Sequence, residues 1–245
     1  MSISNPSVKN PATKFIEWNG QTGGLRWYNK ETEKNEPLEL PLRFIVLDQL
    51  NTVVGFNESE KSGIYANEVH DLSNEVLSVK FFRGGTLAKG TWENISDKVK
   101  ANGGKFCKTV YALMKVGDDF DLVAFKFTKS SFGAWLDFSK KVDLTKKVVQ
   151  VEDSFVKGKK GSVEYKTPVF TALELSDSHL QMAIEADKEL QEYFKVYKNQ
   201  QREKINEETV TTEFKPQTYE RATRGGDDVP PVKEEDLNSG EPLPF

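Results

Sequence analysis

The stretch KFCKTVYALMKVGDDFDLVAFKFT, residues 105–128, carries the clearest fold signal in this chain of 245 residues. Two runs rich in β-branched and aromatic residues, Lys105 to Val116 and Phe120 to Thr128, flank Gly117-Asp118-Asp119, which is typical of a hairpin turn. In the second run the larger apolar side chains fall on one face and Lys126 on the other, as in a half-buried strand. The stretch therefore predicts an antiparallel β-hairpin.

The same pattern recurs on both sides of this hairpin. Short apolar and aromatic runs cut by Gly, Asn and Asp predict further strands at Lys14–Trp18, Gly24–Tyr28, Leu40–Leu47, Thr52–Phe56, Val76–Arg83, Val148–Val156 and Ser162–Leu175. Helical patterns occur at Thr91–Ala101, Ser131–Lys141 and Ser178–Gln201. This order predicts a mainly β fold with a few helices, an OB-fold-like antiparallel barrel followed by a C-terminal helix, with a β-sandwich as the alternative.

Charge is distributed unevenly along the chain. The 34 basic and 38 acidic residues give a net charge of -4, but residues 225–245 alone hold six acidic side chains and one basic one. This segment therefore carries -5 and the rest of the chain +1. A near-neutral body excludes a uniformly basic, histone-like mode of binding, so any cationic surface has to be local.

Composition also limits the other classes of protein. With 37% apolar residues and no run near about 18 consecutive apolar residues, the chain is predicted to be soluble and cytoplasmic, with one main domain and no membrane segment. Cys107 is the only cysteine, and His70 and His179 are the only histidines. We therefore expect no intrachain disulfide, no structural zinc and no cofactor, and we interpret Cys107 as a small core residue.

We divide the chain into a flexible N-terminus (1–12), a main domain (13–203) that includes the C-terminal helix at about 178–201, a linker (204–224) and a disordered acidic tail (225–245). The acidic residues of the tail repel one another and its prolines prevent regular helix or central strand. Its apolar end gains free energy only when something buries it. The tail is therefore predicted to dock a partner, through Asp227, Asp228, Glu234, Glu235, Asp236, Glu241, Leu243, Pro244 and Phe245.

An acidic, proline-containing C-terminus that closes on Pro244-Phe245 resembles the tails of bacterial and bacteriophage single-stranded DNA-binding proteins. The sequence departs from the bacterial pattern at Glu241-Pro242-Leu243, where an unbroken aspartate run would stand. The resemblance covers less than a tenth of the chain. It implies that the tail recruits replication and recombination proteins and that the body binds single-stranded DNA.

Binding of unpaired nucleic acid without sequence readout needs cations along the phosphates and flat side chains on which bases stack. Four predicted strand regions hold both kinds of residue: Arg26 to Tyr28, Lys80 to Arg83, the run of Lys105, Phe106, Lys108 and Tyr111, and Lys126 to Lys129. From these we predict a DNA-binding set of Arg26, Trp27, Tyr28, Lys80, Phe82, Arg83, Lys108, Tyr111 and Lys126. For each ring the alternative is a core position, because alternation buries half of every strand.

Lys157-Gly158-Lys159-Lys160-Gly161 is the most concentrated positive element. It lies between two predicted strands and resembles the flexible basic hairpin that closes over the backbone in many nucleic-acid-binding barrels. Lys157, Lys159 and Lys160 therefore join the predicted DNA-binding set. The alternative is a hairpin tip whose lysines serve only solubility.

These observations favour a non-enzymatic, sequence-nonspecific single-stranded DNA-binding protein of a phage replication or recombination system, which would act in the cytoplasm of a bacterial host. No phosphate-binding Gly-x-x-x-x-Gly-Lys-Ser/Thr motif is present. The alternatives are a β-rich protein-interaction or virion structural module with a solubilising tail, and a nuclease with an unrecognised metal site. The sequence leaves the oligomeric state open.

Overall fold

The computed structural model describes residues 9–117 and 119–210, with side chains up to residue 203. The predicted tail, residues 211–224 of the predicted linker and Asp118 of the predicted turn lie outside these residues. In chain order the strands are β1 (Lys14–Asn19), β2 (Gly24–Asn29), β3 (Lys34–Leu38), β4 (Leu42–Asn57), β5 (Ser62–Ala66), β6 (Leu77–Phe81), β7 (Thr86–Gly90), β8 (Gly104–Val116), β9 (Asp119–Thr128), β10 (Lys147–Lys160) and β11 (Val163–Glu174). The helices are α1 (Trp92–Ala101), α2 (Lys129–Ser139), the short 3-10 helix η1 (Leu144–Lys146) and α3 (Asp177–Val210).

All eleven strands belong to one sheet, in the order β3-β2-β1-β9-β8-β4-β5-β6-β7, with β10 pairing both β4 and β11. The prediction of a mainly β fold with a few helices is confirmed. The sheet is not closed, so the predicted barrel is not confirmed. The purely antiparallel arrangement is wrong in one place, because β1 runs parallel to β9.

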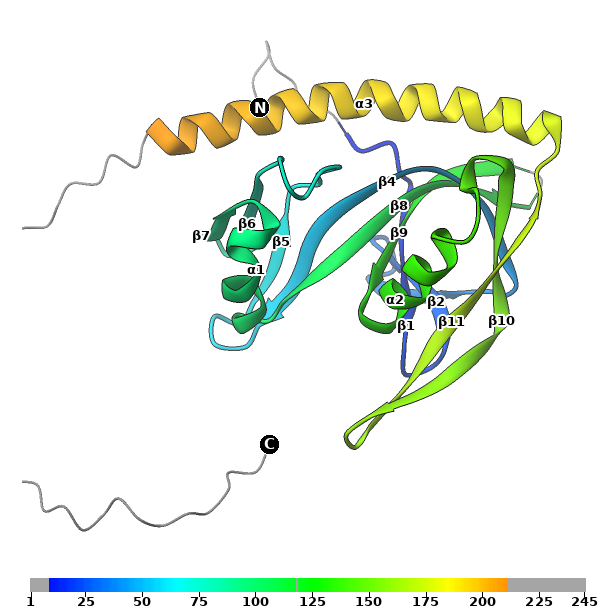
Figure 1. The fold of residues 1–245 in the computed structure, drawn as a ribbon, viewed down its shortest axis with the longest axis horizontal. Helices are drawn as coiled ribbons and strands as arrows, with labels where there is room; N and C mark the ends of the chain where they lie inside the picture. The colour runs from blue at the N-terminus through cyan, green and yellow to red at the C-terminus, as the bar shows by residue number, and fades with distance from the viewer. Residues whose placement is uncertain (1–8, 118, 211–245) are drawn as a thin grey trace, which may run out of the picture.

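A long ribbon of β4 and β8 connects two lobes, each with its own core (Figure 1). In the large lobe, α2 inserts Trp135 against Phe44, Phe125 and Phe127 of the sheet. In the small lobe, α1 packs on β5–β7 through a separate cluster that includes Ile95 and Val99 of the helix. Between the lobes, Leu50 and Tyr111 of the ribbon pack against Leu190 and Phe194 of the last helix.

The strand β4 corrects the predicted strands at Leu40–Leu47 and Thr52–Phe56, which are one element of 16 residues. Asp48, Gln49 and Asn51 suggested a break, but a bulge between Val46 and Asp48 accommodates them. Each has a partner: Asp48 accepts from Gln191, Gln49 accepts from the Trp135 indole, and Asn51 donates to the carbonyl of His70. Sequence patterns did not predict β3, β5 and β7, which are five residues each and lack a long apolar run.

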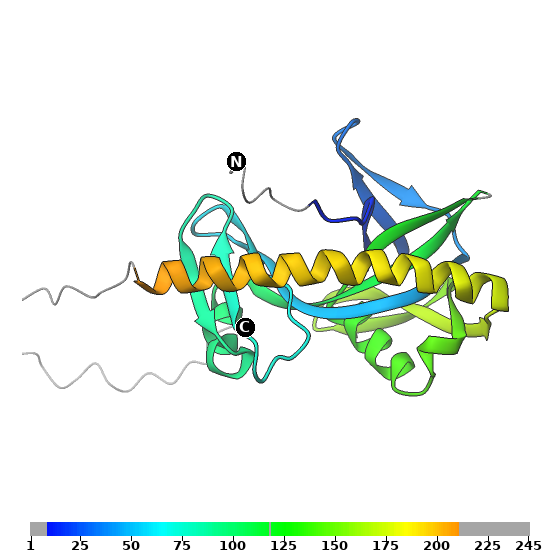
Figure 2. The same cartoon turned by 90° about the horizontal axis from the view of Figure 1, so that it is seen from above.

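The helix α3 lies across both lobes (Figures 1 and 2). The side chains of its residues Ala183, Leu190 and Phe194 are buried, as the apolar periodicity of this segment predicted. It runs to Val210, so the predicted linker is wrong between residues 204 and 210. Within the described ranges, no helix combines the length and the apolar character needed to cross a membrane.

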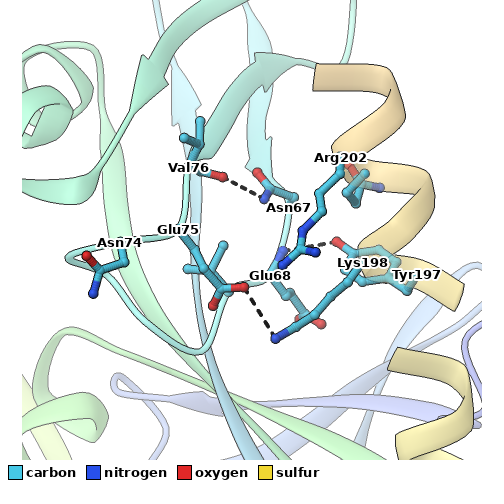
Figure 3. Close-up of a pocket in the computed structure, with 10 residues that line it drawn as sticks. Asn67, Glu68, Asn74, Glu75, Val76, Tyr197, Lys198 and Arg202 are labelled. Atoms are coloured by element: carbon cyan, nitrogen blue, oxygen red, sulfur yellow. Dashed lines mark hydrogen bonds and ion pairs between the residues drawn. The ribbon is translucent and has the colours of Figure 1, made fainter. Parts of the chain in front are cut away.

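A pocket of about 340 Å³ marks the place where α3 meets the loop between β5 and β6 (Figure 3). Lys198 Nζ lies 3.3 Å from Glu75 Oε1, and the Tyr197 hydroxyl accepts from the backbone N–H of Glu68 at 3.0 Å. The carboxylate of Glu75 also accepts from the backbone N–H groups of His70 and Asp71. These contacts hold the small lobe to α3. We call the contacts of Glu75, Lys198, Tyr197 and Glu68 the clamp and interpret their role as structural.

Candidate nucleic-acid interface

One face of the sheet, called here the outer face, carries a cross-strand row of cationic and aromatic side chains. Residues directly opposite one another on paired strands project to the same face. The first row runs Lys105–Val54–Tyr65–Lys80 across β8, β4, β5 and β6. It places two lysines at the ends of a row that an aromatic ring occupies in the middle.

A second row lies on the same face in the large lobe. It runs Lys126–Glu17–Arg26 across β9, β1 and β2, and Thr109 of β8 lies opposite Lys126. Lys105 and Thr109 are four residues apart on β8, so both rows share one face and lie about 13 Å apart. Arg26 Nη2 is 3.9 Å from Glu17 Oε2, which partly offsets the charge of this row.

Exposed rings accompany the second row. Phe15 and Tyr28 each lie two residues from a member of the row and therefore project to the outer face. Their exposed fractions are 39% and 53%. Lys126 Nζ lies 5.0 Å from the centre of the Phe15 ring, within the range of a cation–π interaction. A flat ring and a cation are thus adjacent here.

A stacked pair of rings accompanies the first row. Phe82, 73% exposed, stacks on Tyr65 with 4.8 Å between ring centres and 21° between planes. The ring lies against Gly63, where an added Cβ would be 2.2 Å from Phe82 Cδ2. The absence of a side chain at Gly63 therefore allows the stack. Its outward side is a flat apolar surface in water.

Two ammonium groups meet where β8 begins and β9 ends. Burial, and secondly the charge of Lys129, lower the pKa of Lys105. Among the described residues, neither lysine has a carboxylate within salt-bridge distance. Like charges held together without a counter-ion make this end of the two strands attractive to an anion.

The opposite face of the β4–β8 ribbon holds an open groove of about 480 Å³. Phe106 of β8 lies there between two helices, with ring centres 5.2 Å from Trp92 of α1 and 5.0 Å from Phe132 of α2. Lys108 also lines the groove and donates to Asn51 Oδ1 at 2.8 Å. Burial lowers the pKa of Lys108.

The sequence-predicted residues do not all lie on one surface. Arg26, Tyr28, Lys80, Phe82 and Lys126 share the outer face. Arg83 follows Phe82 and lies 3.5 Å from the Glu60 carbonyl through Nη1. Lys108 lies on the opposite face. Lys157, Lys159 and Lys160 are exposed on the β10–β11 hairpin, which projects from the large lobe (Figure 1).

Two predicted stacking residues need correction. Tyr111 is completely buried, because α3 and Phe194 cover it, and no base can reach its ring. Trp27 alternates with Arg26 and Tyr28 and therefore projects to the other face of β2, where it packs against the large-lobe core. The alternation was visible in the sequence, but the face that α3 covers was not.

Sequence reasoning did not select Phe15, Tyr65, Lys105, Lys129 or Phe132. Phe15 carried a usable signal, because it alternates with buried Ile16 in a predicted strand. Tyr65 lies in β5, which was not predicted. Lys105 and Lys129 lay in runs identified as favourable, but only the pairing of β8 with β9 brings them together.

In the described part of the chain, the side chains form neither a reactive cysteine site nor a metal site. Cys107 is completely buried, as predicted, and burial raises the pKa of its thiol to about 12. A thiol with such a pKa is not an effective nucleophile near neutral pH. Among residues 9–117 and 119–203, no group of three or more His, Cys, Asp and Glu side chains is arranged to hold a metal ion.

The predicted partner-binding residues, from Asp227 to Phe245, lie outside the described residues, so the tail remains a prediction from sequence. No protein-family model, curated protein or solved structure matches this chain. The function of the two faces of the ribbon is therefore inferred from their own geometry.

Proposed function

We propose that this protein binds single-stranded DNA without regard to sequence, as part of a phage replication or recombination system. The observation that carries the proposal is the outer face, where two cross-strand rows place lysines and an arginine beside exposed rings. The first row supplies Lys105 and Lys80, and the second supplies Lys126 and Arg26.

The rings favour an unpaired strand over a duplex. Bases in a duplex hide their faces in the stack, whereas unpaired bases can stack on Phe15, Tyr28 or the Tyr65–Phe82 pair. Each such stack contributes about 1 to 3 kcal/mol and tolerates any base, since every base has a π face. The cations then follow the phosphates, which makes the affinity fall with salt.

The proposal has three further parts. The large lobe would be a relative of the OB barrel; the turn after β1 approaches β11, with Lys166 N–H donating to the Gly20 carbonyl at 2.7 Å. The acidic tail would recruit replication proteins and compete with DNA for the cationic face, because its charge is complementary. The protein would act non-enzymatically in the host cytoplasm, without a cofactor.

The test is a binding titration of the full chain with oligo-dT and with duplex DNA of equal length, at several salt concentrations. We expect clear preference for oligo-dT and an affinity that falls as salt rises. The variant Lys105→Met/Lys129→Met should bind oligo-dT at least about tenfold more weakly, from the loss of two charge contacts. Lys98→Met/Lys188→Met, which removes two exposed lysines on the helices α1 and α3, is the matched control and should bind as the parent does.

Absence of oligo-dT binding even in dilute buffer would refute the proposal. It would favour the protein-interaction or virion module, in which the exposed rings are buried by another protein. Incubation of end-labelled strands with Mg²⁺ or Mn²⁺ addresses the nuclease alternative. Intact strands are expected, and cleavage that depends on the metal would contradict a non-enzymatic role.

A further inference from the structure

The groove opposite the outer face is lined by side chains that suit a small aromatic ligand. Leu72, Phe106, Phe132 and Leu136 line it. Phe106 is held from both sides by Trp92 and Phe132, so its ring is fixed before any ligand enters. The volume of about 480 Å³ lies in the usual range for small-ligand sites, about 300 to 1,000 Å³.

The ammonium group of Lys108 is held in place in this groove and can donate further hydrogen bonds. Asn51 Nδ2 donates to the His70 carbonyl and Asn51 Oδ1 accepts from Lys108 Nζ, each at 2.8 Å. Both polar atoms of the Asn51 amide are thus fixed, and the amide oxygen in turn positions the Lys108 ammonium. An ammonium has three N–H donors, and this bond uses one of them. A half-buried ammonium gains from an acceptor on the ligand.

The charges around the groove favour a neutral ligand. Asp71 also lines it and keeps its carboxylate ionised, because hydrogen bonds from Asn74 and Ser73 lower its pKa. A phosphate would meet this carboxylate inside the groove, whereas Lys105 and Lys129 offer it two cations outside. A flat, neutral ring with a hydrogen-bond acceptor fits the apolar walls and the single donor better.

The groove and the outer face meet at one end of the β8–β9 pair. Lys105 precedes Phe106 on β8 and projects to the outer face, and Lys129 lies one helical turn before Phe132 at the start of α2. Figure 2 shows α2 and the strands β1 and β2 on opposite sides of α3. A phosphate at the two lysines therefore lies next to a base that turns inward onto Phe106 and Phe132.

Resting on the proposed function, we propose that this groove is a base pocket. It takes one unpaired nucleobase of the bound strand, with Lys108 donating to a carbonyl oxygen of the base. The Phe106 and Phe132 rings lie at 64° to one another, so the base stacks on one of them and meets the edge of the other. Thymine and guanine carry such an oxygen beside their ring nitrogens, whereas adenine offers only ring nitrogens as acceptors. The pocket therefore favours keto bases over adenine.

The first experiment compares the affinities of oligo-dT and oligo-dA of equal length for the full chain and for Lys108→Met. Methionine keeps the apolar stem and removes the donors. The preference for oligo-dT over oligo-dA should fall by about fivefold to tenfold, from the loss of one hydrogen bond to the keto group. Lys115→Met, on the same strand and exposed, should leave the preference unchanged.

The second experiment uses the unaltered protein, so it does not depend on the folding of a variant. A dT strand containing 5-iododeoxyuridine is bound, irradiated and mapped by peptide sequencing. The base pocket predicts cross-links at Phe106, Phe132 or Trp92 in addition to those on the outer face. Cross-links confined to Phe15, Tyr28, Tyr65 and Phe82 would overturn the pocket and support the outer face.

The two proposals fail in different ways. If the parent protein binds neither oligo-dT nor oligo-dA, the proposed function is refuted. If both bind and Lys108→Met keeps the full preference for oligo-dT, the function stands and the base pocket is refuted. A peptide or another apolar ligand in the groove would show itself in the same way, as a preference that Lys108 does not affect.

Discussion

The hydroxyl of Tyr111 donates a hydrogen bond to Glu68 Oε2 at a distance of 2.7 Å. It also accepts one from Asn10 Nδ2 at 2.8 Å, and the ring is completely buried against Phe194. These contacts join β8 to the loop after β5, to the segment before β1 and to α3. An aromatic residue placed among cations in the sequence therefore stabilises the junction of four elements and offers no surface to a base.

Tyr111→Phe should lower the free energy of unfolding by about 1 to 3 kcal/mol, because Glu68 loses its donor and Asn10 its acceptor in a buried place. The affinity for oligo-dT should not change. Urea denaturation and a binding titration on the same preparation measure both. Unchanged stability with weakened DNA binding would mean that the ring contacts DNA after all.

The cation–π pair of Lys126 and Phe15 should contribute to binding through phosphate contact. Lys126→Met should reduce the slope of log affinity against log salt by about 0.7, the value for one phosphate contact on a single strand. Measurement of oligo-dT affinity at five or more salt concentrations gives the slope. An identical slope in parent and variant would place Lys126 away from the DNA.

The Tyr65–Phe82 stack should act as a platform for one base. Phe82→Ala should weaken oligo-dT binding by about 1 to 3 kcal/mol and leave the unfolding transition nearly unchanged, since the ring is mostly exposed. Phe82→Tyr keeps a ring and is the matched control. If Tyr and Ala variants bind equally well, the ring does not stack with a base.

Much of this fold follows from periodicity that a single sequence displays. The strands β1, β2, β8 and β9 and the helices α1 and α2 lie within a few residues of their predicted bounds, because alternation and helical spacing are local properties. The break predicted near Asp48 was wrong, since the partners that satisfy its polar side chain, His70 and Gln191, are distant in sequence. Local composition cannot show such partners.

The candidate interface shows the same limit. Arg26, Tyr28 and Lys126 were predicted because cations and rings lie close together in the sequence, and strand pairing places these three on one face. The burial of Tyr111 depends on α3, which begins more than sixty residues later. The Lys105–Lys129 pair and the groove on Phe106 depend on register between strands and on two helices, and register is set by long-range pairing.

The thiol of Cys107 should report on opening of the sheet. Burial is the main reason why its pKa is raised to about 12, so very little thiolate exists near neutral pH, and the sulfur is inaccessible as well. Labelling by a thiol reagent at about pH 8 should be slow in the folded protein and fast in urea. Rapid labelling of the native protein would show that the β8–β9 region opens readily.

The clamp between α3 and the small lobe should weaken in acid. Burial raises the pKa of Glu75, but the backbone N–H groups of Asp71 and His70 and the charge of Lys198 outweigh it, so the net pKa lies below 4.5. A carboxyl group whose folded pKa is depressed stabilises the fold above its unfolded pKa. That contribution is lost as the pH falls through the folded pKa.

Glu75→Gln should therefore be less stable than the parent at pH about 7, by about 1 kcal/mol, because the amide keeps one acceptor but loses the charge. The difference should shrink as the pH falls below 4.5 and through the depressed pKa of the parent carboxylate, because that carboxylate then becomes neutral as well. Glu185→Gln, on an exposed position of α3, is the matched control and should show no such dependence. Urea denaturation at both ends of this pH range measures the effect. If the difference in unfolding free energy between Glu75→Gln and the parent is the same at both pH values, the clamp depends on the shape of the side chain and not on its charge. In that case Lys198→Met would leave the stability unaltered as well.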